Sequence, residues 1–176
     1  MQLIYAPNAI LKQKSRPVSM EELGQEISDQ LQEMRNIISQ HSALGLAAPQ
    51  IGDLRRIIVV DVRYGLTGMI NPEVIWFTAH ASTIEEQCLS ITGFQQEVTR
   101  PRTIGVRWLT EQGEVKEADF SDLEAHVIQH EIDHLDGITL LEKSGKLKKS
   151  RYLQRISKQE KTIRRQIKKL LSEANL

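Results

Sequence analysis

Hydrophobic positions near the start of the chain recur at a helical spacing. Apolar residues three or four positions apart form one series, which consists of Leu23, Ile27, Leu31, Met34 and Ile38. A series with this period lies on one face of a helix and can be buried there. Ser19 and Glu22 have the spacing of a capping box, in which the glutamate side chain reaches back to the serine amide. We therefore expect an amphipathic helix that begins at Ser19 and ends before Gly45.

The middle of the chain carries the shorter apolar pattern of β-strands. Four strands are expected, over residues 56–62, 68–75, 103–109 and 114–120. Asn71-Pro72 breaks the second strand, because proline has no amide proton and favours a turn. Glu111-Gln112-Gly113 is typical of a hairpin turn and would join the last two strands.

Two further helices are predicted after the strands. The first covers about 121–135, where Ser121 and Glu124 form a second capping-box pattern and Gly137 marks the end. The other covers about 146–172 and has an apolar stripe that Glu160 interrupts: Leu153, Ile156, Ile163, Ile167 and Leu170. The order of helix, several strands and two helices predicts an α+β fold rather than alternating βαβ units.

Composition narrows the class of protein. The 176 residues fit one domain, and 40% hydrophobic with 26% charged residues is ordinary for a globular protein. Cys88 is the single cysteine, so no internal disulfide can form, and a reducing compartment is the simpler expectation. No apolar stretch is long enough to cross a membrane, and no secretory signal is recognisable. We expect a cytoplasmic protein.

The net charge of zero conceals two oppositely charged parts. Residues 1–142 contain 11 Lys and Arg against 21 Asp and Glu, which gives −10. Residues 143–176 contain 12 Lys and Arg against 2 acidic residues, which gives +10. A basic tail on an acidic body is typical of a segment that faces nucleic acid, and a well-solvated surface helix has the same composition. Charge alone leaves both interpretations open.

The pattern with the clearest chemistry is His130-Glu131-Ile132-Asp133-His134. It falls in the helix predicted over 121–135, where side chains four residues apart lie on the same face. Both imidazoles can then bind one metal ion, and Glu131 can take a proton from a water that the ion activates. The alternative is a surface helix that carries two histidines by chance. The capped, amphipathic helix around the motif favours the metal site.

A catalytic metal site of this kind needs a third protein ligand. One class of zinc peptidase supplies a histidine at the position of Leu140, and leucine cannot bind a metal. Another class uses a later glutamate, but Glu142, Glu160 and Glu173 are poorly placed for this role. The thiol of Cys88 is the best donor upstream. A lone cysteine can also be an inert, buried small residue, but a two-histidine site that lacks a ligand favours the metal-binding interpretation.

Small residues precede an amide in the segment Leu44-Gly45-Leu46-Ala47-Ala48-Pro49-Gln50. Glycine lets a backbone approach a ligand closely, and the Gln50 amide can both donate and accept a hydrogen bond. The segment can equally be the turn from the first helix into a loop.

Three segments taken together resemble the peptide deformylases. They are Gly45-Leu46-Ala47-Ala48-Pro49-Gln50, Glu86-Gln87-Cys88-Leu89-Ser90 and Gln129-His130-Glu131-Ile132-Asp133-His134-Leu135, in this order and spacing. The likeness includes Ile4-Tyr5-Ala6-Pro7 and Pro101-Arg102. It implies antiparallel sheets packed around a central helix that carries the HExxH motif, with a long C-terminal helix. It also implies one catalytic domain over residues 1–145, to which a basic helix over 146–176 belongs.

The resemblance implies a metallohydrolase that removes the N-formyl group from the initiator methionine of nascent polypeptides and releases formate. Three side chains would hold one divalent ion: Cys88, His130 and His134. This ion would be Fe²⁺ in the cell, and Zn²⁺, Ni²⁺ or Co²⁺ could replace it. Glu131 would be the base, while the Gln50 side chain and the Leu89 amide would donate to the formyl oxygen. Gly45 would bond the substrate backbone, and the methionine pocket would be lined by Leu44, Leu123, Val127 and the ring of His130.

Three positions depart from the family pattern. Ala43 and Gln87 each stand where the family commonly has glycine, and we place both at the substrate groove. Gln87 predicts an altered groove, because its side chain can reach into it. His126 stands where the family often carries an aliphatic or a long basic residue. We expect it at the pocket rim rather than on the metal, although it could also pack under a loop.

The expected partners are an N-formyl-methionyl peptide or nascent chain and, through the basic helix, the ribosome. The helix could instead pack on the body or pair with another chain, and we expect a monomer without membrane contact. Two other functions are considered. One is a metallopeptidase, which the missing third ligand disfavours. The other is a catalytically weak relative with an altered substrate range, or one that only binds formylated chain ends or the ribosome, which Gln87 alone favours.

Overall fold

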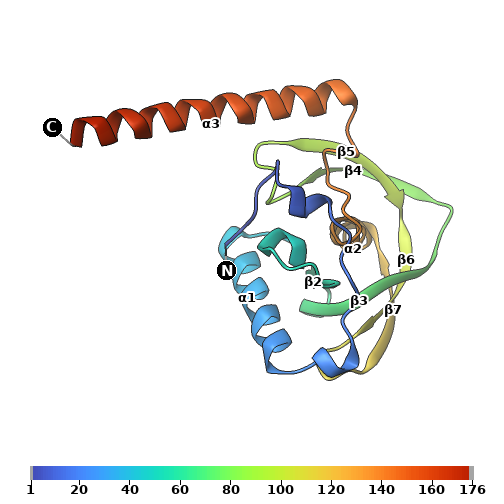
Figure 1. The fold of residues 1–176 in the computed structure, drawn as a ribbon. Coiled ribbons are helices and arrows are strands. Elements are labelled where there is room, and N and C mark those ends of the chain that lie inside the picture. The colour runs from blue at the N-terminus through green and yellow to red at the C-terminus, as the bar shows by residue number, and fades with distance from the viewer. Residues whose placement is uncertain (1, 175–176) are drawn as a thin grey trace. The chain divides into compact units, whose positions relative to one another are not determined.

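The computed structural model describes residues 2–174 (Figure 1). The chain forms two compact units, residues 1–140 and 141–176. Within the described part, no helix combines the length and the apolar character that crossing a membrane requires.

The first unit is built on a five-stranded antiparallel sheet with the order β1-β2-β3-β6-β7. The strands are β1 Gly45–Ala47, β2 Ile57–Val62, β3 Gly65–Phe77, β6 Thr103–Leu109 and β7 Val115–Ser121. A second, two-stranded antiparallel sheet pairs β4, Ala81–Gln87, with β5, Gln95–Pro101. Three short 3₁₀ turns are η1 Ala9–Lys12, η2 Met20–Glu22 and η3 Ala48–Ile51. The predicted α+β class with antiparallel sheets is confirmed.

Two helices cover opposite faces of the larger sheet: α1, Gln25–His41, and α2, Asp122–Leu135. Successive residues of a strand point to opposite faces. Accordingly, Ile57 and Val59 belong to the core formed with α1, whereas Ile58 and Val60 belong to the core formed with α2. Figure 1 shows α2 enclosed by strands of both sheets. The helix that carries the HExxH motif is therefore central, as predicted.

The first helix begins later than predicted. Its predicted apolar face is right, since Ile27, Leu31, Met34 and Ile38 are buried. The amide of Ser19 does donate to Glu22 Oε2 at 2.9 Å, but this half of the capping box closes the 3₁₀ turn η2. Arg16 also binds the Glu22 carboxylate through both terminal nitrogens, at 2.7 and 2.8 Å. The chain is extended at Leu23, and α1 starts only at Gln25.

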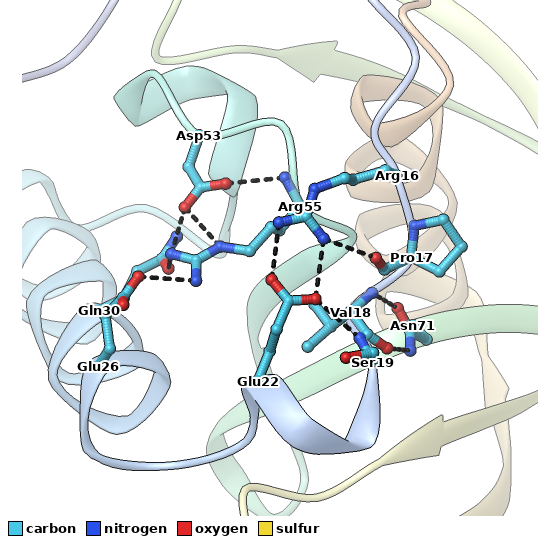
Figure 2. Close-up of polar contacts among 10 residues, drawn as sticks. All are labelled: Arg16, Pro17, Val18, Ser19, Glu22, Glu26, Gln30, Asp53, Arg55 and Asn71. Carbon is cyan, nitrogen blue, oxygen red and sulfur yellow. Dashed lines mark hydrogen bonds and ion pairs between the residues drawn. The ribbon is translucent and has the colours of Figure 1, made fainter.

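The break expected at Asn71-Pro72 is a bulge inside one long strand. The register of β3 on β6 shifts between Ile70 and Glu73, and Asn71 has a left-handed φ of 52°. Its side-chain amide stabilises the irregularity: Nδ2 donates to the Val18 carbonyl and Oδ1 accepts from the Val18 amide, both at 2.8 Å (Figure 2). The strand predicted over residues 68–75 therefore continues through Asn71-Pro72 and is longer at both ends than expected.

Polar contacts around Arg55 join α1 to the segment before β2 (Figure 2). The guanidinium of Arg55 donates to Asp53 through Nε at 2.8 Å, to Glu26 at 2.8 Å and to Gln30 at 2.7 Å. The same segment pairs with the N-terminal region, because the Arg56 amide donates to the Arg16 carbonyl at 2.8 Å.

The second capping box is not formed, although α2 begins where it was predicted. Ser121 is the N-cap, but its side chain makes no capping bond and lies 3.0 Å from the Thr103 hydroxyl. Glu124 accepts instead from the amide of Arg63 at 2.5 Å and from its guanidinium at 2.7 Å. Glu124 therefore pairs with Arg63, which is distant in sequence, instead of capping the helix.

The second unit contains α3, Lys146–Ala174, which matches the long helix predicted over about 146–172. Ile163, Ile167 and Leu170 are exposed, and Lys149 pairs with Glu142 at 2.7 Å. The side chain of Glu173, considered above as a ligand, lies outside the described residues.

Candidate metal centre and active site

Three buried side chains converge between α2 and the end of β4. His130 and His134 lie one turn apart on α2, and Cys88 directly follows β4. Their ligand atoms all lie within 4.8 Å of one another, and Cys88 Sγ is 3.2 Å from His134 Nε2. One thiolate and two imidazoles in this arrangement suit a first-row transition metal. The structure thus brings together the three residues that the sequence nominated as ligands.

Glu131 is buried beside this cluster, and its Oε2 atom has no hydrogen-bond partner among the described residues. Its Oε1 lies against Gly45, where a β-carbon would approach to 2.6 Å. Burial raises the pKa of Glu131 to about 7, although the charge of His130 opposes that rise. A carboxyl group with such a pKa can accept and return a proton near neutral pH.

The electrostatic environment distinguishes the two histidines. Burial lowers the pKa of His134, and the charge of His130 lowers it further, so its imidazole is neutral. His130 differs because its hydrogen bonds to Cys88 and Glu86 outweigh its burial and raise its pKa. His130 Nδ1 lies 2.9 Å from Glu86 Oε2, which leaves Nε2 for the cluster.

Glu86 belongs to a buried charge network behind the ligands. Arg100 donates to both of its oxygens, from Nε at 2.6 Å and from Nη2 at 3.0 Å. Arg100 Nη1 also donates to Asp133 at 2.7 Å. Burial raises the pKa of Glu86, but the bonds from Arg100 and His130 lower it well below its usual range. Glu86 is thus held ionised as the hydrogen-bond acceptor of His130.

Gln50 is fixed in the turn η3 with its amide directed at the cluster. Its Oε1 accepts from the Ala47 amide at 2.7 Å, which determines which end of the side chain points outward. Its Nε2 then lies 3.2 Å from Ser90 Oγ and 3.6 Å from Cys88 Sγ. A buried N–H donor is therefore available next to the cysteine.

A cavity of about 560 Å³ opens onto these groups. Its lining includes every residue that the sequence assigned to substrate: Ala43, Leu44, Gly45, Gln87, Leu123, His126 and Val127. Leu89 also lines it. Leu44, Gln87 and Leu123 are exposed at its opening, whereas His126 is 1% exposed.

Sequence reasoning missed several polar residues that the structure places beside the candidate ligands. Arg100 and Ser82 were not nominated, and Glu86, Ser90 and Asp133 were noticed only as parts of motifs. A usable signal was present for Glu86, because residues two apart on a strand share a face and Cys88 is two positions on. No local pattern marks Arg100, whose partners come from β4 and α2.

Comparison with known proteins agrees with this geometry. The sequence profile of the polypeptide deformylase family matches residues 1–150. The chain belongs to this family. It is accordingly a metallohydrolase, a peptide deformylase, which removes the formyl group from the N-terminus of nascent polypeptides.

Individual deformylases resemble the chain over most of its length. A peptide deformylase from Caldanaerobacter subterraneus subsp. tengcongensis is 40% identical over 134 residues, which are 76% of this chain and 82% of that protein. The crystal structure of peptide deformylase from Ehrlichia chaffeensis has a TM-score of 0.85 at 28% identity and covers 92% of this chain and 97% of its own. The Met-Ala-Ser-bound deformylase of Acinetobacter baumannii has a TM-score of 0.76 at 32% identity and covers 82% and 98%.

Proposed function

We propose that Cys88, His130 and His134 hold the divalent ion of this deformylase and that Glu131 is its general base. The convergence of three buried ligand atoms within 4.8 Å carries this proposal. The residues fit the group chemically, because a thiolate and two imidazoles leave a position open for a reactant. When bound, the ion would polarise a water and the formyl oxygen. The donor set suits several first-row metals, and we propose Fe²⁺ as the ion in the cell, with Zn²⁺, Ni²⁺ or Co²⁺ able to occupy the site in a purified sample.

Glu131 would accept a proton from the attacking water and deliver it to the methionine nitrogen, which leaves as a free amine when its bond to the formyl carbon breaks. Two observations support this role: Glu131 Oε2 has no hydrogen-bond partner among the described residues, and the pKa of Glu131 is about 7. Gln50 Nε2 and the Leu89 amide would donate to the formyl oxygen as negative charge develops there. Each such donor typically contributes about 2.7–4 kcal/mol to the stabilisation of a transition state.

The cavity would bind the methionine and the residues that follow it, which all lie on the nitrogen side of the reacting bond. Leu44, Leu123 and Val127 supply apolar surface for the methionine side chain. Gly45 would bond the substrate backbone beside Ala43, and Gln87 would contact the residues that follow the methionine. The Acinetobacter baumannii relative binds Met-Ala-Ser, which makes a formyl-Met-Ala-Ser peptide the natural test substrate.

The basic unit would contact the ribosome. Its support is the concentration of 12 Lys and Arg between residues 143 and 176, against two acidic residues. We further propose that residues 146–176 act as a C-terminal helix of the catalytic domain over 1–145, and that the protein works as a monomer in the cytoplasm. Slower deformylation of ribosome–nascent-chain complexes, but not of free peptide, after charge reversal on α3 would support the ribosome contact; equal rates would refute it.

The test of the active site is formate release from formyl-Met-Ala-Ser by protein purified without oxygen and loaded with Fe²⁺ or Ni²⁺. We expect release by the wild type, and Glu131→Ala should lower the rate by about 10²–10⁴-fold. Glu124→Ala, on the same helix but paired with Arg63, is the matched control and should retain activity. Full activity in Glu131→Ala would refute the assignment of the base, and cleavage of internal peptide bonds instead would favour a metallopeptidase.

A further inference from the structure

The carboxylate of Glu86 binds a second imidazole besides that of His130. His126 Nδ1 lies 3.1 Å from Glu86 Oε1, while His130 Nδ1 lies 2.9 Å from Oε2. Arg100 adds one donor to each oxygen. An ionised carboxylate offers about four acceptor positions, so these four contacts account for all of them. The carboxylate is consequently held on both oxygens.

The partners also determine where the histidine protons reside. Because the carboxylate can only accept, the two imidazoles must each carry a proton on Nδ1. Nε2 of His130 then remains for the metal. Nε2 of His126 lies 2.9 Å from Ser82 Oγ, whose hydroxyl can donate to it. A continuous chain of contacts therefore links Ser82 on β4 to a proposed metal ligand on α2.

We propose that His126 is a positioning residue of the metal centre. Together with Ser82 it fixes Glu86 Oε1, so that Oε2 stays directed at His130 Nδ1 and holds that imidazole in the tautomer and orientation that bind the ion. This inference rests on the proposed metal site, and its distinct content is that the fourth contact on Glu86 contributes to metal affinity.

Packing alone does not account for His126. Its side chain is 1% exposed, and a buried imidazole is costly unless its nitrogens find partners. An aliphatic residue would fill the same space on α2 without that cost. Both nitrogens of His126 are instead engaged, one of them with the residue that orients His130. Groups that orient metal ligands in this way typically change metal affinity by about 10–100-fold when removed.

The test compares two substitutions that differ mainly in the donor. His126→Asn keeps an N–H near the place of Nδ1, whereas His126→Leu fills the volume without one. We expect His126→Leu to weaken Zn²⁺ binding by about 10-fold, the lower end of that range because it acts through Glu86. His126→Asn should stay close to the wild type, and Ser82→Ala should fall between them. Thr103→Val, which removes a hydroxyl pair at the start of α2 but touches none of this chain, is the control for general loosening.

Zn²⁺ affinity is measured by competition with a chromophoric chelator on the full-length protein, and long-range ¹H–¹⁵N spectra report imidazole protonation in the Zn²⁺-loaded wild type. We expect His126, His130 and His134 each to be protonated on Nδ1 with an unprotonated Nε2, since Nε2 of His134 faces Cys88. Protonation of His126 on Nε2 alone would overturn the proposal even if the leucine variant fails to fold, as would equal affinity in the asparagine and leucine variants. Unchanged affinity in Cys88→Ala would instead refute the metal site itself.

Discussion

Replacement of Gly45 by alanine should inactivate the enzyme through Glu131. A β-carbon at position 45 would lie 2.6 Å from Glu131 Oε1, 2.9 Å from its Cγ and 3.0 Å from its Cδ. Real β-carbons do not approach other heavy atoms so closely, so either the glutamate or the strand β1 must move. Because Glu131 is buried on α2 next to the candidate ligands, the expected response is displacement of its carboxylate by about an ångström.

Such a displacement has a large effect on proton transfer. A misplacement of about 1 Å can lower the rate about 10²-fold, and a positioned general base contributes about 10²–10⁴-fold in total. We therefore expect Gly45→Ala to lower kcat/KM for formyl-Met-Ala-Ser by about 10²-fold, with metal content unchanged. Gly24→Ala is the matched control, because a β-carbon there meets no atom within 4 Å and the backbone is extended.

A double-mutant cycle separates this mechanism from a role of Gly45 in holding the substrate backbone. If Gly45→Ala acts by displacing Glu131, the change should add almost nothing in a Glu131→Ala background. If the two losses multiply instead, Gly45 acts independently of the base, and the steric argument is refuted. The metal content of all four proteins, measured before assay, excludes a trivial loss of the ion.

Four further outcomes are expected. Folding raises the pKa of Glu131 from 4.5 to about 7, so ionisation of this side chain destabilises the metal-free protein increasingly as the pH rises from 4.5 to 7. In urea unfolding, the free energy of unfolding of Glu131→Gln should exceed that of the wild type by up to about 3 kcal/mol at pH 8 and should equal it at pH 4. Gln50→Glu should lower kcat about 10²–10³-fold in steady-state assays, because a carboxylate would face Cys88 and the developing oxyanion. Asn71→Gly keeps the left-handed backbone but loses both hydrogen bonds to Val18, so the free energy of unfolding should fall by about 1–3 kcal/mol. Removal of the metal by a chelator should abolish formate release and lower the Tm, and divalent ions should restore both.

The sequence predicted those elements whose buried side is apolar. The strand β2 and the strand β6 follow the expected hydrophobic pattern, and the stripe of α1 lies in the core as expected. Gly113 has a φ of 79° in the turn where a hairpin was predicted. In each case one local pattern, hydrophobic spacing or a turn residue, decides the outcome without help from distant residues.

The strand β4 was missed because its inward-facing side chains include polar residues that contact the site. Its outward residues are exposed, and the inward ones include Ser82 and Glu86, so no hydrophobic alternation is visible. The second capping box failed for a related reason. Glu124 has the right spacing for a cap, but Arg63, which is distant in sequence, binds it, and such a partner is invisible to a local motif.

The same periodicities that build the core also assemble the site. His126, His130 and His134 recur every four residues and so share one face of α2, just as Glu86 and Cys88 share one side of the chain two residues apart. The two sets face each other across a buried interface. The Glu86 carboxylate therefore contacts the imidazoles of His126 and His130, and the Cys88 thiol contacts the imidazole of His134. Buried charges are costly to desolvate, and Arg100 offsets part of that cost by pairing with both Glu86 and Asp133. Arg100, far from the motif in sequence, thus holds the carboxylate that contacts His130. Local patterns could therefore nominate the candidate ligands, but they could not predict the network around them.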